Sequence, residues 1–150
     1  MKEMYYVYNN EAIASCVFLS ILNKVGTLDI ARSCLVLPFL LDDRTVNYLK
    51  RNEDVELNLE QLIREQSRLF ISFNKRYLSL LPITINSLML LSKSNQIKIE
   101  NEITTADFLN IESEDLGDRF NKIEDITSKF LSIIEQYSTI QLYKILNVQL

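Results

Sequence analysis

The chain has 150 residues, with 16 Lys or Arg, 20 Asp or Glu, and neither histidine nor tryptophan. This length suits one compact domain with a real hydrophobic core, and we expect residues 1–150 to form a single domain. The absence of histidine excludes a His-dependent catalytic triad, an HExxH metal site and a C2H2 zinc finger, and the net charge of −4 argues against a general affinity for nucleic acid.

The first part of the chain is predicted to be helical because its apolar residues recur at spacings of three and four. Asn9 or Asn10 can cap a first helix, which Gly26 would end. Asp29 can cap a second helix over residues 30–41, which is apolar nearly all round. A helix without a polar face is usually central in its domain.

The middle of the chain is predicted to form three further helices, as its scarcity of glycine and proline favours. A short one begins at residues 42–43. The clearest helical pattern covers residues 57–81, with apolar residues along one face and charged residues largely on the other. Pro82 fits the first turn of the next helix, which is predicted to end within residues 92–95.

The period then changes, and residues 96–100 alternate between polar and apolar, which predicts a short β-hairpin reaching Thr104. Acidic residues that suit a loop and a helix start follow at Glu112, Glu114, Asp115 and Asp118. A last long helix is predicted over residues 120–137, and Ser138 or Thr139 can cap a final short one. The fold class is therefore mainly α, a compact helical domain with one short β-hairpin, and its helix–helix–hairpin order also fits a winged-helix unit.

The residues offer little chemistry of their own. Cys16 and Cys34 form no CxxC pair, which indicates buried free thiols in a reducing cytoplasm rather than a zinc site or a disulfide framework. Gly26 and Gly117 cannot build a phosphate-binding loop. No signal peptide and no apolar run of the ~20 residues that span a membrane is present. We expect a cytoplasmic, non-enzymatic chain that binds no cofactor and no metal and does not contact a membrane.

An alternative is a winged-helix transcriptional regulator that binds DNA. Residues 82–93 would then enter the major groove, where base readout and phosphate contact need Arg, Lys, Asn or Gln. This segment carries one charge, Lys93 at its end, and the hairpin places Lys98 beside Glu100 and Glu102. Direct contact with nucleic acid is therefore not favoured, and such a helix suits burial or a protein partner.

Taken in order, these segments resemble a known family, the small middle component of bacterial three-component ABC-ATPase systems. The residues that carry the resemblance are Asn9-Asn10-Glu11-Ala12, the stretch Leu35-Val36-Leu37-Pro38-Phe39-Leu40-Leu41, Pro82 followed by residues 88–99, and the closing residues 137–148. The resemblance covers essentially the full chain. Asn10 stands where many relatives have proline, and Asn147 where many have glycine.

The resemblance implies a chain that works beside an ABC-type or SMC-like ATPase and an effector protein, in a system proposed to defend bacteria against phages or plasmids. Lamassu-type defence complexes are similar in organisation. The chain would be a non-catalytic adaptor between these two partners. The family is recognised by packing residues, so the resemblance supplies no catalytic residue.

The candidate partner interface lies on the last helix and comprises Tyr137, Gln141 and Tyr143. Tyrosine is favoured at protein interfaces because its ring packs while its hydroxyl tolerates water. Residues at the edge of the core would explain the same tyrosines. Alanine at Gln141 or Tyr143 is expected to weaken partner binding with little loss of thermal stability.

Overall fold

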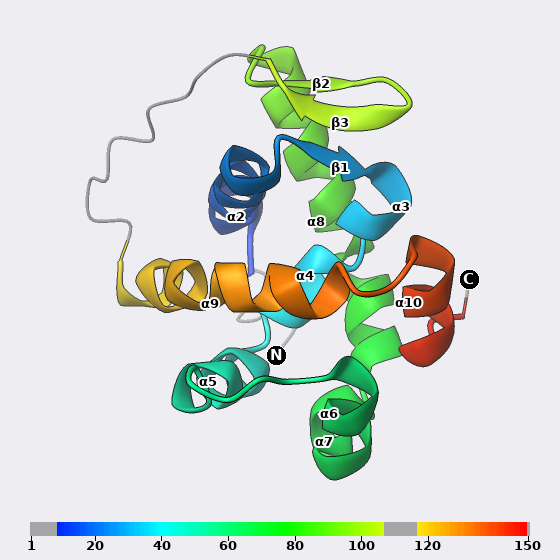
Figure 1. Cartoon of the computed structure of the whole chain (residues 1–150). Coiled ribbons are helices and arrows are strands. Elements are labelled where there is room, and N and C mark those ends of the chain that lie inside the picture. The colour runs from blue at the N-terminus through cyan, green and yellow to red at the C-terminus, as the bar shows by residue number, and fades with distance from the viewer. Residues whose placement is uncertain (1–8, 107–116, 150) are drawn as a thin grey trace.

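The structure, a computed structural model, describes residues 9–106 and 117–149 as a set of helices with one small antiparallel sheet (Figure 1). The elements are α2 (Glu11–Val25), β1 (Thr27–Asp29), α3 (Ile30–Ser33), α4 (Val36–Leu40), α5 (Asp43–Arg51), α6 (Leu59–Glu65), α7 (Ser67–Phe70), α8 (Phe73–Lys93), β2 (Ile97–Ile99), β3 (Glu102–Thr105), α9 (Asp118–Ile134) and α10 (Thr139–Ile145). The mainly α fold with a short hairpin is confirmed. None of the described helices has the length and apolar character needed to cross a membrane.

The first helix begins and ends at predicted residues. The side chain of Asn10 accepts hydrogen bonds from the backbone N–H groups of Ala12 and Ile13. Gly26 ends α2 at a φ of 77°, a conformation that glycine adopts without steric cost. The predicted cap Asp29 likewise starts α3, and the short helix expected at residues 42–43 is α5, which Asp42 caps.

The single helix predicted over residues 30–41 is wrong, because the chain forms α3 and α4 with a break at Cys34 and Leu35. Pro38 explains the break. A continuous helix would require the missing N–H of Pro38 to bond the Cys34 carbonyl, and the proline ring would clash with that carbonyl. In α4, Pro38 instead occupies the first turn, where backbone N–H groups have no helical partner.

The helix predicted over residues 57–81 is also wrong, since the chain bends at Gln66 and again before Phe73 to give α6, α7 and α8. Pro82 does not start a helix but lies in the middle of the 21-residue α8. The helix continues through it even though the Leu78 carbonyl loses its usual partner. Leu78 and Pro82 both lie on the exposed side of α8.

The predicted hairpin is confirmed as β2 and β3, and it gains a third strand that the sequence did not indicate. Strand β1 pairs antiparallel with β3, so the order is β1-β3-β2. Leu28 of β1 lies opposite the buried Ile103 of β3. Strand β1 contains a single apolar residue, Leu28, so it shows no alternation of the kind that residues 96–100 show, which explains why it was missed. The winged-helix arrangement stays a prediction.

Helix α4 lies in the middle of the molecule, behind α9 and in front of α8 in the view of Figure 1. All five of its residues are buried. The Phe39 ring contacts three aromatic rings from other helices, at centroid distances of 5.8 Å to Phe70, 5.0 Å to Phe73 and 5.2 Å to Phe130. The expectation that the segment 30–41 is central is therefore confirmed for residues 35–41, whereas Ile30 and Ala31 of α3 are exposed.

The last two helices differ slightly from their predicted bounds. Helix α9 ends at Ile134, before Tyr137. Ser138 caps α10 in a capping box, in which its hydroxyl accepts from the Gln141 backbone and the Gln141 side chain accepts from the Ser138 backbone. Asp118 is the first residue of α9, and the other acidic residues predicted there (Glu112, Glu114 and Asp115) lie outside the described residues.

Candidate partner-binding groove

A groove of about 760 Å³ lies between α3, α8 and α10, and we call it the α10 groove. In Figure 1, α3 and α10 lie one above the other at the right-hand side of the molecule, with α8 to their left. The residues that line it are Ala31, Cys34, Tyr77, Thr139, Ile140, Tyr143, Lys144, Asn147 and Val148. Most of these side chains present carbon, so the groove suits an apolar side chain with a polar group beside it.

Tyr143 is the predicted interface residue that lines this groove. Its ring meets the Tyr77 ring edge to face, with centroids 5.8 Å apart and planes at 81°. Its hydroxyl donates to the Ala31 carbonyl at 2.5 Å and lies 3.3 Å from the Tyr77 hydroxyl. Burial is the main cause that raises the pKa of Tyr143 above its ordinary value. Tyr143 thus joins α10 to both other walls of the groove.

Tyr137 and Gln141 do not line the groove. The Gln141 side chain is engaged at the start of α10, where its Oε1 accepts from the Ser138 N–H at 2.8 Å. Tyr137 is half-buried and packs against the hydrophobic core. An alanine at Gln141 or Tyr143 would therefore disturb α10 itself, so it tests folding as well as binding.

Arg32 of α3 forms hydrogen bonds with the residues at the start of α10. Its guanidinium donates to the Tyr137 carbonyl at 2.5 Å and to the Thr139 hydroxyl at 3.1 Å. These bonds join residues more than 100 positions apart in the chain, and they hold α3 against the start of α10.

The most exposed apolar side chain of the groove is one that the sequence reasoning missed. Ile140, in the first turn of α10, is 72% exposed. Leu142 and Leu146 form the buried side of the helix, and Ile140 lies off that side. The helical period of α10 could have revealed it, because a large aliphatic residue placed away from the buried stripe is a candidate for contact with a partner.

Cys34 lines the groove, and Cys16 lies in α2. Burial is the main cause that raises the pKa of both thiols, whereas a nucleophilic cysteine needs a lowered one. In residues 9–106 and 117–149 no group of three or more metal-ligating side chains is found. The arrangement in the groove is suited to contact rather than to acid–base or nucleophilic chemistry.

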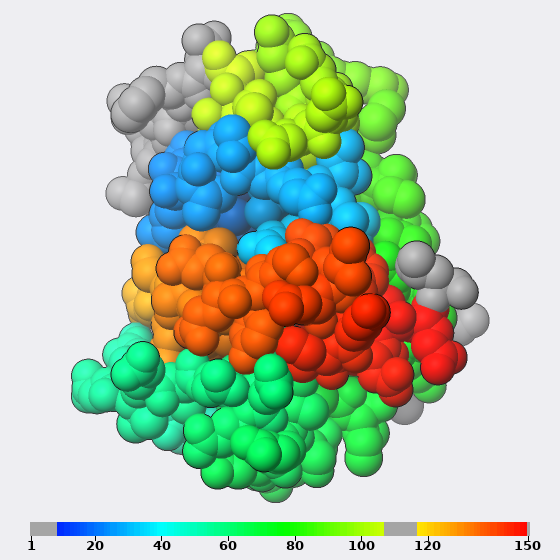
Figure 2. All heavy atoms as spheres, turned by 45° about the vertical axis from the view of Figure 1, so that its right-hand side comes forward, coloured from blue at the N-terminus to red at the C-terminus, as the bar shows by residue number. Residues whose placement is uncertain are grey.

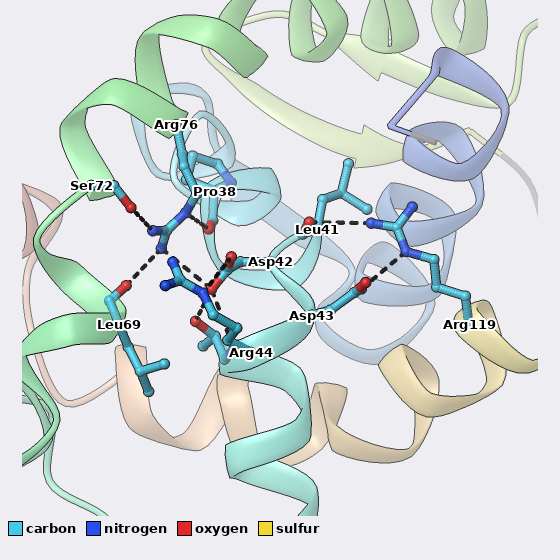
Figure 3. A network of polar contacts seen from close by, with 10 residues as sticks. Pro38, Leu41, Asp42, Asp43, Arg44, Leu69, Ser72, Arg76 and Arg119 are labelled. Atoms are coloured by element: carbon cyan, nitrogen blue, oxygen red, sulfur yellow. Dashed lines mark hydrogen bonds and ion pairs between the residues drawn. The ribbon is translucent and has the colours of Figure 1, made fainter. Parts of the chain in front are cut away.

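The buried Arg76 and the partly buried Arg119 form the main polar cluster away from the groove (Figure 3). The Arg76 side chain donates to the carbonyls of Pro38 and Leu69, at 3.1 Å and 3.0 Å, and to the Ser72 hydroxyl at 2.8 Å. It also lies 3.9 Å from the Asp42 carboxylate. These contacts join the bend between α7 and α8 to α4, so their role is structural.

Arg119 plays a similar part at the start of α9. It donates to the Asp43 carboxylate at 3.2 Å and to the Leu41 carbonyl at 3.1 Å (Figure 3). A further bond of 2.5 Å joins it to the side chain of Asn9. This arginine therefore ties α9 to the α4–α5 junction and to the start of α2.

No curated protein and no solved structure matches the chain. One family model matches residues 3–150, and its description is ABC-three component (ABC-3C) system Middle Component 3. The match includes the buried stretch 35–41, which forms the centre of the fold, and residues 137–148, which include one wall of the α10 groove. A middle component is an accessory component of its system rather than the ATPase. The chain therefore belongs to the middle components of ABC-three component systems.

Proposed function

We propose that this chain is a non-catalytic, cytoplasmic adaptor that acts as a single domain, and that it bridges the ATPase and the effector of its three-component system in defence against phages or plasmids. The observation that supports it most is the family match over residues 3–150. The sequence adds that the chain has no histidine and only two glycines, so the chemistry of nucleotide hydrolysis would reside in a partner.

The α10 groove is our candidate for one of the two partner contacts. Ile140 stands at its rim with most of its surface exposed, and the groove beside it is lined by Tyr77, Tyr143 and Val148. Tyrosine is enriched among the residues that carry most of the binding energy in protein interfaces, and here the buried Tyr77 and the half-buried Tyr143 lie in the groove that Ile140 also lines. Tyr137 and Gln141 would contribute indirectly, because they hold the start of α10.

Co-expression with the other two components of the system, followed by size-exclusion chromatography, tests the proposal. We expect the chain to co-elute with the ATPase component. An Ile140→Asp substitution should weaken this complex at least tenfold, because a carboxylate would lose its hydration in the interface. Ile71→Asp is the matched control, since Ile71 is 85% exposed and lies outside the groove.

Elution of the wild-type chain as a lone monomer beside both partners would overturn the adaptor role. Equal weakening by the Ile140 and Ile71 variants would instead remove the groove as the contact. The alternative of a DNA-binding regulator is tested on the isolated chain. Binding to duplex DNA that falls steeply with salt would favour it, because such a slope reports contacts to phosphates.

A further inference from the structure

Helix α8 carries a second apolar surface, which lies outside the α10 groove. Three large apolar side chains on it are about half exposed, namely Leu78 at 52%, Ile85 at 52% and Met89 at 48%, and Pro82 between them is also exposed. We call these four residues the α8 stripe. In Figure 2, where the right-hand side of Figure 1 comes forward, the light green α8 forms the right-hand edge of the upper part of the molecule.

The spacing of the α8 stripe is that of a helix-pairing surface. Residues 78, 82, 85 and 89 are separated by four, three and four positions, which places them along one line of an α-helix. The opposite side of α8 is buried against the rest of the fold, including α2 and α4. The stripe is thus an apolar seam on a helix whose other face is already packed.

Charges mark both ends of the stripe and are absent between them. Lys75 and Lys93 are exposed, lie three and four positions beyond its ends, and form no ion pair with any described residue. From residue 77 to residue 92 the helix has no charged side chain. Beside the stripe, the carboxylate of Glu11 from α2 accepts a hydrogen bond from Asn86.

These two lysines decide which kind of helix fits. A second copy of this chain would bring lysine close to lysine in either direction, because parallel pairing aligns each lysine with itself and antiparallel pairing places Lys75 beside Lys93. Like charges at such positions disfavour pairing. A helix with acidic residues at both ends of its apolar seam would satisfy both lysines at once.

We propose that the α8 stripe binds an amphipathic α-helix of another protein, whose apolar seam is flanked by acidic residues. With a rise of 1.5 Å per residue, the distance along α8 from Lys75 to Lys93 is about 27 Å. The partner helix therefore needs about five turns. The inference goes beyond the proposed function and does not depend on it, since it rests on α8 alone.

The test uses two labelled peptides of 21 residues with leucines at heptad a and d positions. One has Glu in its first and last turns, and the other has Lys there. Fluorescence anisotropy at nanomolar peptide should show the Glu-ended peptide binding at least tenfold more tightly. The double variant Lys75→Glu/Lys93→Glu should reverse this preference, because it reverses the charges at both ends of the stripe.

Two variants distinguish binding at the α8 stripe from non-specific hydrophobic binding. Ile85→Asp should abolish binding of both peptides, whereas Leu90→Asp should leave it within twofold. Leu90 is a matched control, since it lies on the same helix with a similar exposure of 55% but about a quarter turn or more away from the stripe. Both positions are exposed, and circular dichroism should show unchanged folding.

Three results would overturn the proposal. Neither peptide binds the wild-type chain, both bind equally, or sedimentation shows a dimer of the chain that Ile85→Asp dissociates. The last result would make a second copy the occupant of the stripe. None of these results bears on the adaptor role, because that role is tested with the other components and through Ile140.

Discussion

Two asparagines end helices in this chain with a backbone conformation that usually selects glycine. Asn95 follows α8 and Asn147 follows α10, with φ values of 60° and 56°. After α10, the Asn147 N–H donates to the Lys144 carbonyl and the Val148 N–H to the Tyr143 carbonyl, both at 3.1 Å. This pair of bonds defines a Schellman motif. Asn147 therefore forms a turn of the kind that glycine usually forms, since asparagine tolerates the left-handed region.

At Asn147, glycine should stabilise the fold and a β-branched residue should destabilise it. Asn147→Gly is expected to raise the free energy of unfolding by about 0.5 kcal/mol, because glycine meets no steric penalty at positive φ. Asn147→Val should lower it by about 1–2 kcal/mol. Urea unfolding followed by circular dichroism measures both. Equal stability of the two variants would show that the residue does not adopt the left-handed conformation.

The candidate groove was only partly predictable from its residues. Tyr143 was found because tyrosines are common at interfaces, but its ring is half-buried against Tyr77 and serves the fold as well. Ile140 was missed because an isolated isoleucine gives no signal until the buried side of its helix is known. Gln141 lies on the last helix as expected, but its side chain completes the capping box.

At the scale of elements, the helix starts that have a side-chain cap were largely predictable and helix continuity was not. Asn10, Asp29, Asp42 and Ser138 all cap the helices expected of them, because capping depends on a side chain and the next few backbone N–H groups. Whether a helix continues or breaks depends on how it packs against residues that are distant in the sequence. The bend before α8, for example, is held by Arg76, which reaches back to the Pro38 carbonyl of α4.

The two prolines show this dependence most clearly, since Pro38 follows a break between two helices and Pro82 lies within one helix. Helix α8 tolerates Pro82 because its other face is packed along most of its length. We expect Pro82→Ala to raise the free energy of unfolding by about 1–2 kcal/mol, since alanine restores an N–H for the Leu78 carbonyl and removes the clash with it. Thermal and urea unfolding measure the change.

A substitution at a nearby exposed position provides the control for that prediction. Ser79→Ala lies on the exposed side of α8 and removes no helical hydrogen bond, so its effect should be only a few tenths of a kcal/mol. A Pro82→Ala variant no more stable than Ser79→Ala would mean that α8 already accommodates the proline without strain.

At the scale of the whole molecule, the fold is held together by a few long-range polar contacts around one hydrophobic core. Arg76 and Arg119 approach the α4–α5 segment from two sides, one from α8 and the other from α9 (Figure 3). Lys129 of α9 adds contacts to the carbonyls of Glu53 and Val55, at 2.9 Å and 2.6 Å, in the chain that follows α5. The central segment is thus fixed by residues that are distant in the sequence, which no local pattern could reveal.

Arg76 should be the costliest of these residues to replace. Its side chain is only 10% exposed, and its removal leaves the carbonyls of Pro38 and Leu69 without that donor. The Asp42 carboxylate, itself 11% exposed, would lose a nearby positive charge. We expect Arg76→Ala to lower the free energy of unfolding by about 3–5 kcal/mol, the range found when one partner of a buried ion pair is removed.

Lys50 supplies the comparison, because its ion pairs with Glu53 and Asp125 lie at the exposed surface, where water and salt screen them. Lys50→Ala should leave the urea midpoint nearly unchanged. Because Arg76 contacts residues before α5, at the α7–α8 bend and in α4, its loss should weaken the whole molecule at once. Far-ultraviolet circular dichroism and tyrosine fluorescence should then report one coincident transition at a lower midpoint. Separate transitions in the two signals would show instead that Arg76 stabilises only the α7–α8 bend.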